Sequence, residues 1–328
     1  MNTLELKARY DIIHPMTFTT ILLLATTAIS SPWDTLLKEE APNSHKATGF
    51  SSEANAIFLD GEMYRGKKTR FFAYYSIPKS ASETSKCPAV VLVHGGLGTA
   101  FDNWVKIWNE RGYAAIAMDT CGSLPIKDEA NPQKWKRHNM SGPTGWGGFS
   151  QIDEPIKDQW PYHAVSAVIL SHNFLRSLPQ IDTKKIGITG ISWGGYLSCI
   201  ASSVDHRFAW AAPVYGCGFY TDGSAWAKTL SEMGERGEKW LRLWDAGVYL
   251  ERAKCPFLFV SGTKDPFFTI LMVKKSAEKI KGPVFYDIRK EMVHSQEAGA
   301  CPESIRSFAD HWSFGKALGE AISDKMPF

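Results

Sequence analysis

The chain has 328 residues, of which 44% are hydrophobic and 22% are charged. These proportions are typical of a globular protein, and together with the length they exclude a disulfide-stapled miniprotein and a low-complexity chain. The net charge is +3, and the basic residues are scattered along the sequence. We therefore expect no nucleic-acid partner, because phosphate binding requires a concentrated basic face.

An apolar segment near the N-terminus is typical of a secretory signal peptide. Residues 18–29 read FTTILLLATTAI and follow Lys7 and Arg9. The segment is shorter than the about 20 residues that a membrane-spanning helix requires. We predict a signal peptide at residues 1–31, a single domain at 32–328, and a secreted or periplasmic protein without a stable membrane anchor. An uncleaved anchor and a buried N-terminal helix are the alternatives.

Apolar and β-branched runs alternate with helical patterns after residue 53, which predicts an α/β fold with helices on both faces of a mostly parallel sheet. We expect eight strands, the first two forming an antiparallel pair, at residues 54–59, 70–77, 89–94, 114–119, 185–190, 208–214, 256–261 and 284–288. We expect helices at residues 101–111, 163–178, 193–203, 268–280 and 302–312.

Two segments interrupt this alternation. Residues 121–160 are rich in Gly, Pro, Trp and Asn, and residues 217–245 are charged and helix-prone. Both follow predicted strands, so both are expected at the carboxyl edge of the sheet, where open α/β folds bind ligands. We interpret them as inserts that form a partial cap.

The six cysteines include no Cys-x-x-Cys pair, which excludes zinc ribbons and thioredoxin-like redox sites. An oxidising compartment would permit disulfides among them. One alternative left open is a disulfide at Cys121 or Cys217 that ties an insert to the body of the fold or to the other insert.

The segment 190–194 reads Gly-Ile-Ser-Trp-Gly between a predicted strand and a predicted helix, which is the context that a G-x-S-x-G nucleophile elbow requires. The tight turn forces Ser192 into a strained backbone conformation, and side chains at Gly190 and Gly194 would collide with neighbouring backbone. An ordinary glycine-rich turn is the alternative interpretation.

A serine hydroxyl becomes a good nucleophile only when a base takes its proton and an acid orients that base. Asp265 follows the seventh predicted strand and His294 follows the eighth, so the order Ser192, Asp265, His294 matches the order of an elbow-type triad. The rival acids are Asp119 and Asp222. The rival bases are His163, His172, His206 and His311, which lie in or beside helical patterns.

The segment 94–98, His-Gly-Gly-Leu-Gly, directly follows the third predicted strand. In an elbow-type site this loop supplies one backbone amide to the oxyanion hole, and the residue after the nucleophile supplies the other. We therefore predict the oxyanion hole at the N–H groups of Gly96 and Trp193.

These motifs together resemble the α/β-hydrolase superfamily over nearly the whole of residues 32–328. The elbow, the segment 94–96 and the segment 118–122 (Met-Asp-Thr-Cys-Gly) are similar to the branch of acetyl xylan esterases, dienelactone hydrolases and prolyl oligopeptidase relatives. The resemblance implies a single catalytic domain that works as a serine hydrolase without cofactor or metal. Dienelactone hydrolases, however, use a cysteine where this chain has Ser192, and acetyl esterases usually have arginine where Cys121 stands.

The resemblance and the predicted export favour a secreted esterase for short acyl groups, such as those of an acetylated carbohydrate. Trp146, Trp160 and Trp226 lie in or beside the inserts and are the candidate substrate-binding residues, although packing is an equal alternative for them. The second hypothesis is an exopeptidase or amidase with the same mechanism.

Two hypotheses from other classes are weaker. Segment 95–98 followed by a strand that ends in Asp119 imitates a dinucleotide-binding unit, but Phe101 stands where the third glycine belongs. A non-catalytic protein on the same fold usually lacks one member of the triad, and here none is missing.

Overall fold

The computed structural model describes residues 31–327. The predicted signal peptide, apart from Ser31, lies outside the described residues. Within them, no helix is long and apolar enough to cross a membrane.

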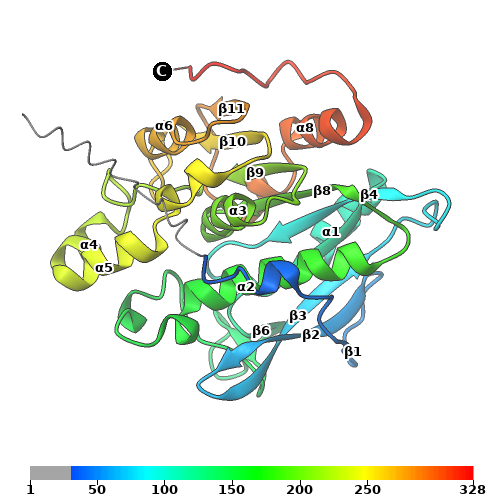
Figure 1. The fold of residues 1–328 in the computed structure, drawn as a ribbon, viewed down its shortest axis with the longest axis horizontal. Coiled ribbons are helices and arrows are strands. Elements are labelled where there is room, and N and C mark those ends of the chain that lie inside the picture. The colour runs from blue at the N-terminus through cyan, green and yellow to red at the C-terminus, as the bar shows by residue number, and fades with distance from the viewer. Residues whose placement is uncertain (1–30, 328) are drawn as a thin grey trace, which may run out of the picture. The chain divides into compact units, whose positions relative to one another are not determined.

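Nine strands of the described chain form one sheet, in the order β1-β2-β3-β5-β4-β8-β9-β10-β11 (Figure 1). The neighbours from β1 to β5 pair antiparallel, and those from β5 to β11 pair parallel. The strands are β1 (Ser44–Lys46), β2 (Asn55–Tyr64), β3 (Lys67–Ser76), β4 (Cys87–Val93), β5 (Ala114–Met118), β8 (Ile181–Ile191), β9 (Trp210–Val214), β10 (Phe257–Gly262) and β11 (Val284–Arg289).

The expected α/β fold and all eight expected strands are therefore confirmed, but the main sheet has nine strands and not the predicted eight. The additional strand, β1, consists of Ser44, His45 and Lys46 and pairs with residues 57–59 of β2. It forms through backbone hydrogen bonds at the edge of the sheet, so its polar side chains give no apolar pattern to detect.

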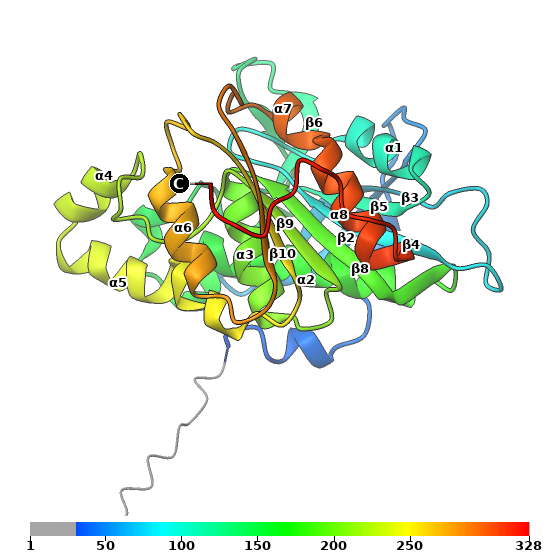
Figure 2. The same cartoon turned by 90° about the horizontal axis from the view of Figure 1, so that it is seen from above.

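Helices cover both faces of the sheet, as expected. Figure 2 shows α1 and α8 on one side and α2 and α3 on the other. The helices are α1 (Asp102–Glu110), α2 (Trp160–Ser177), α3 (Trp193–Val204), α4 (Ala227–Glu232), α5 (Glu235–Trp244), α6 (Ile270–Glu278), α7 (Gln296–Ala300) and α8 (Glu303–Phe314). All five predicted helices are present.

Strand β4 shows why the central strands read as continuous apolar runs. Its seven residues are all buried. Val91 and Val93 belong to the core beneath α2 and α3, whereas Val90 and Leu92 belong to the core beneath α1 and α8. A strand covered on both faces needs apolar side chains at every position, because successive side chains point to opposite faces.

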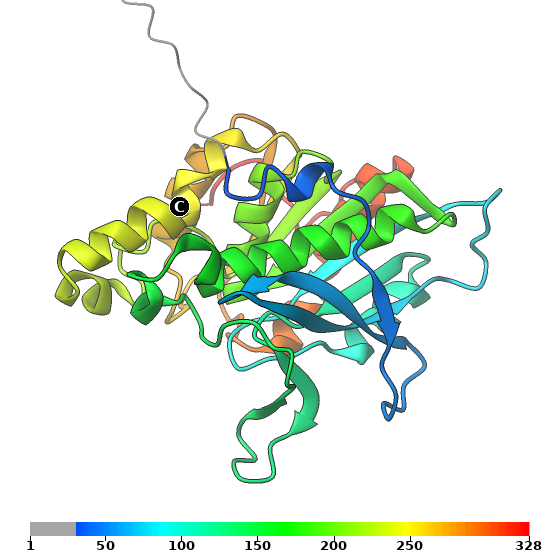
Figure 3. The ribbon, with the colours of Figure 1, turned by 60° about the horizontal axis from the view of Figure 1, so that its bottom comes forward.

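The two inserts contact each other. The first contains a two-stranded sheet of β6 (Ser123–Lys127) and β7 (Trp135–Arg137), which extends away from the main sheet in Figure 3. The second contains α4 and α5. The indole N–H of Trp240 in α5 donates a 2.6 Å hydrogen bond to the carbonyl of Gly147, and the Trp240 ring lies 4.8 Å from the ring of Phe149.

The cysteines of the described chain are all free, so the alternative of a disulfide at Cys121 or Cys217 is wrong. The Cys121 thiol instead fills a buried polar position, where it donates to the Gly145 carbonyl and accepts from the indole N–H of Trp160, each at 3.2 Å. Burial raises the pKa of the Cys121 thiol well above its usual range, so this thiol is not a reactive nucleophile.

We predict that a thiol reagent modifies one cysteine per native chain, namely the exposed Cys301, because the other five thiols are buried. Six thiols should react after unfolding in denaturant without reductant. Titration with a chromogenic disulfide reagent measures both numbers, and four or fewer thiols in the unfolded chain would mean that a disulfide exists.

Candidate active site

Ser192 lies in the turn between β8 and α3 with a strained backbone, φ 56° and ψ −118°. Such a conformation costs a non-glycine residue about 1–3 kcal/mol and persists only where its surroundings enforce it. Here the Ser192 N–H donates to the carbonyl of Val214 at 2.9 Å. A Cβ atom at Gly190 would overlap the carbonyl oxygen of Gly194, and one at Gly194 would overlap that of Val93. The steric need for both glycines, expected from the sequence, is confirmed.

The structure brings Asp265 and His294 together. Nδ1 of His294 lies 2.6 Å from Oδ2 of Asp265, and Oδ1 of Asp265 accepts the backbone N–H groups of Phe267 and Phe268 at 2.9 and 2.8 Å. The Asp265 side chain is 1% exposed and that of His294 is 15% exposed. With Nδ1–H donated to the carboxylate, Nε2 is the basic nitrogen of His294.

His294 lies at the same edge of the sheet as the elbow. Its ring centroid is 4.4 Å from that of Tyr215, the residue after Val214, and 4.6 Å from that of Phe267. Within residues 31–327, no hydrogen bond joins the hydroxyl of Ser192 to His294. In enzymes without bound substrate this contact is often long, and it tightens when substrate binds.

The loop after β4 packs directly on the elbow. A Cβ atom at Gly95 would lie 3.2 Å from the Cβ of Ser192, and one at Gly96 would lie 3.0 Å from Cδ1 of Trp193. Trp193 is the first residue of α3, where backbone N–H groups have no partner within the helix. The structure thus places the two predicted oxyanion-hole residues, Gly96 and Trp193, side by side next to Ser192.

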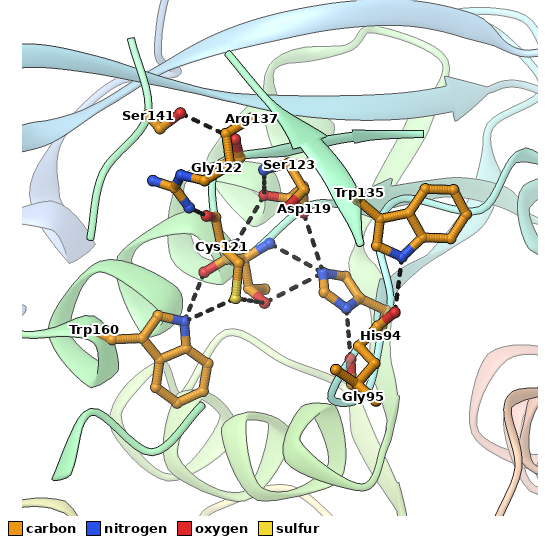
Figure 4. A network of polar contacts seen from close by, with 12 residues as sticks. His94, Gly95, Asp119, Cys121, Gly122, Ser123, Trp135, Arg137, Ser141 and Trp160 are labelled. Carbon is orange, nitrogen blue, oxygen red and sulfur yellow. Dashed lines mark hydrogen bonds and ion pairs between the residues drawn. The ribbon is translucent and has the colours of Figure 1, made fainter. Parts of the chain in front are cut away.

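The peptide between Gly95 and Gly96 has a fixed orientation. The Gly95 carbonyl accepts the N–H of Gly98 at 3.1 Å and lies 2.8 Å from Nδ1 of His94 (Figure 4). Because carbonyl and N–H point in opposite directions from a planar peptide, fixing the carbonyl also fixes the direction of the Gly96 N–H.

His94 acts as a neutral donor in this arrangement. It is buried, and burial lowers its pKa to about 4. Its Nε2 accepts the backbone N–H of Thr120 at 3.1 Å, which leaves Nδ1–H to donate to the Gly95 carbonyl. Sequence reasoning missed this role of His94, and only the spatial proximity of residues 94 and 120 reveals it.

The rival acids and bases are engaged elsewhere. Oδ2 of Asp119 accepts the N–H groups of Cys121 and Ser123, each at 2.8 Å, and burial raises the pKa of Asp119 to about 7. Asp222 pairs with Lys275 at 2.5 Å. Among the rival histidines, His163 contacts the Lys157 carbonyl and His172 contacts the Asp205 carboxylate. His206 contacts the Ser203 carbonyl and His311 contacts the Lys316 carbonyl.

The three candidate substrate-binding tryptophans differ in exposure. Trp160 is fully buried, and its indole N–H donates a 2.8 Å hydrogen bond to the Thr120 carbonyl. Trp160 is therefore a core residue, and its assignment to substrate binding is wrong. Trp146 and Trp226 are half-buried. Trp226 packs 4.7 Å from the ring of Trp193, and Trp146 lies against Gly96.

Sequence reasoning missed Phe267. This side chain is 37% exposed and lies between Trp226, at 5.9 Å, and His294, at 4.6 Å. Its position immediately after the Asp265-Pro266 dipeptide is the signal that could have identified it, since a loop that orients the acid also approaches the base.

The described residues contain no group of three or more His, Cys, Asp or Glu side chains that could hold a metal ion. The dinucleotide-binding hypothesis requires Asp119 to face a ribose. Asp119 instead is fully buried and bonded to backbone N–H groups, so it cannot serve that purpose.

Comparison with known proteins matches residues 71–289 to the dienelactone hydrolase family. An acetyl xylan esterase from Paenibacillus sp. R4 has a TM-score of 0.66 at 19% identity, over 84% of this chain and 90% of that chain. Acetyl xylan esterase 1 from Thermoanaerobacterium sp. JW/SL YS485 has a TM-score of 0.61 at 19% identity, over 80% of this chain and 87% of that chain. An acylaminoacyl peptidase from Pyrococcus horikoshii has a TM-score of 0.56 at 18% identity, over 76% of this chain and 39% of that chain.

No curated protein matches the sequence. The solved structures share the fold with this chain, and the resemblance to the α/β-hydrolase superfamily is confirmed. Because the family match covers more than half of the sequence, the chain belongs to the dienelactone hydrolase family of α/β hydrolases.

Proposed function

We propose that the chain is a serine carboxylic-ester hydrolase in which Ser192 is the nucleophile, His294 the general base and Asp265 the orienting acid. The observation that carries this proposal is the 2.6 Å contact between His294 and Asp265 at the sheet edge where the strained turn presents Ser192. A buried carboxylate in that position selects the tautomer of His294 that has a basic Nε2.

The reaction follows from these assignments. Nε2 of His294 takes the Ser192 proton as the hydroxyl attacks the ester carbonyl, and the N–H groups of Gly96 and Trp193 hold the resulting oxyanion. His294 then gives the proton to the leaving alcohol. Water, activated by the same imidazole, releases the acid and restores Ser192.

A small acyl group and a sugar-like alcohol are the proposed substrate features. Bulky, partly exposed rings lie beside the proposed catalytic groups, with Trp226 at 4.7 Å from the Trp193 ring and Phe267 at 4.6 Å from the His294 ring, which favours a short acyl chain. Trp146, Trp226 and Phe267 offer partly exposed rings, which suit stacking on a sugar face. The fold shared with acetyl xylan esterases agrees with this proposal.

An amide substrate is the second candidate, because acylaminoacyl peptidases share the fold and acyl transfer from amides uses the same groups.

The proposal that the chain is exported rests on the apolar segment at residues 18–29. Under this proposal the substrate is met outside the cytoplasm, by a chain that works without a cofactor.

Replacing Ser192 with alanine should lower kcat for p-nitrophenyl acetate by about 1000-fold or more, because no other hydroxyl occupies the elbow. The matched control is Ser202→Ala, which removes a buried hydroxyl of α3 that bonds only the carbonyl of Ser198 and should leave kcat unchanged. Undiminished turnover in folded Ser192→Ala would remove the assignment.

Among p-nitrophenyl esters from acetyl to octanoyl, kcat/KM should be highest for acetyl and lower by about tenfold or more for octanoyl, because one missing or surplus methylene changes binding by about 1–3 kcal/mol in a fitted pocket. Acetylated xylan and a peptide anilide complete the series. Faster cleavage of the anilide than of any ester would support the amide candidate and contradict the esterase.

A further inference from the structure

The turn that carries the Gly96 N–H is strained. It spans residues 95–98 and is closed by the 3.1 Å hydrogen bond from Gly98 to Gly95. Leu97, at its third position, has φ 61°, a conformation that favours glycine. The Leu97 side chain is 76% exposed, so its burial does not compensate for the strain. Contacts to the backbone of the turn must therefore hold it in place.

One such contact comes from the first insert. The indole N–H of Trp135 in β7 donates a 2.7 Å hydrogen bond to the carbonyl of Leu97. Figure 4 shows this indole beside the loop that begins at His94. The Gly95 carbonyl is bonded by His94 and Gly98 of the same loop. Two carbonyls of the turn therefore accept hydrogen bonds, one from its own loop and the other from the first insert.

The indole of Trp135 is itself held in place. Lys127, its cross-strand partner in β6, places its ammonium group 3.6 Å from the ring centroid, which is a close cation–π contact. Phe101, at the start of α1, contacts the indole edge-on with ring centroids 6.4 Å apart. Both contacts use the ring and leave the N–H free to donate to Leu97.

The base of the β6–β7 hairpin is anchored to the sheet. The Asp119 carboxylate, at the end of β5, accepts the N–H of Ser123, where β6 begins. Arg137, at the end of β7, donates to the carbonyls of Cys121 and Gly142. The hairpin is therefore fixed at its base and can transmit this rigidity to Leu97 through Trp135.

We propose that Trp135 is a positioning residue for catalysis: its N–H holds the strained Leu97 carbonyl and so keeps the Gly96 N–H directed at the oxyanion. This inference rests on the proposed function. It assigns the β6–β7 hairpin a part in the catalytic step in addition to any contact with substrate.

The test replaces Trp135 with phenylalanine, which keeps a ring for Lys127 and Phe101 but has no N–H. We expect kcat for p-nitrophenyl acetate to fall about tenfold while KM changes less than twofold, because the loss affects the transition state and removal of a whole oxyanion donor would cost about 100–1000-fold. The matched control is Trp312→Phe, since the indole N–H of Trp312 has no partner within the described chain.

A double-mutant cycle separates positioning from packing. Leu97→Gly removes the strain at position 97, so the Trp135→Phe replacement should lower kcat less than threefold in that background. An equal loss of kcat in both backgrounds, or no loss in the single variant, would overturn the inference.

Hydrogen exchange gives a readout that does not require activity. The Gly98 amide, which is bonded to the Gly95 carbonyl, should exchange faster in Trp135→Phe than in Trp312→Phe, and unchanged exchange would overturn the inference. If the wild type hydrolyses no ester, or if Ser192→Ala retains full activity, the proposed function fails, whereas faster exchange of the Gly98 amide would still establish the support of the turn by Trp135.

Discussion

The left-handed backbone of Ser192 is the constraint on which the rest of the site depends. It is possible because Gly190 and Gly194 allow α3 to approach β4 and β8 more closely than any side chain would permit. That close approach fixes the backbone of Ser192 at the start of α3, with the N–H of Trp193 next to it in the chain. The loop at Gly95 and Gly96 packs directly against the elbow.

The other groups of the site reach the same edge from separate strands, and buried contacts rather than surface charges hold them. Asp265 orients His294 from the loop after β10, with both carboxylate oxygens satisfied. His94 and Asp119 lie beneath the oxyanion loop as a second, fully buried polar layer. Burial keeps His94 neutral, so its Nε2 can accept the Thr120 N–H while its Nδ1–H donates to the Gly95 carbonyl.

Much of this arrangement could be predicted from the sequence. The eight main strands are apolar runs bounded by turn residues, and Ser192, Asp265 and His294 each follow one of them. The rest depends on information that local patterns lack. Strand β1 is short and polar and gives no apolar pattern, and an indole in the sequence does not indicate whether it faces solvent, as Trp160 shows. The hydrogen bond from Trp135 to Leu97 joins residues 38 positions apart, and it exists only because the hairpin is anchored beside the turn.

Covalent labelling tests the central claim most directly. A fluorophosphonate reacts with a serine only where a base and an oxyanion hole activate it, and peptide mass spectrometry locates the adduct. The account predicts a single adduct on Ser192 of the native wild-type chain, formed at least about 100-fold more slowly in His294→Gln, since a positioned general base contributes about 100–10,000-fold. An unlabelled native protein, or an adduct on another residue, would contradict it.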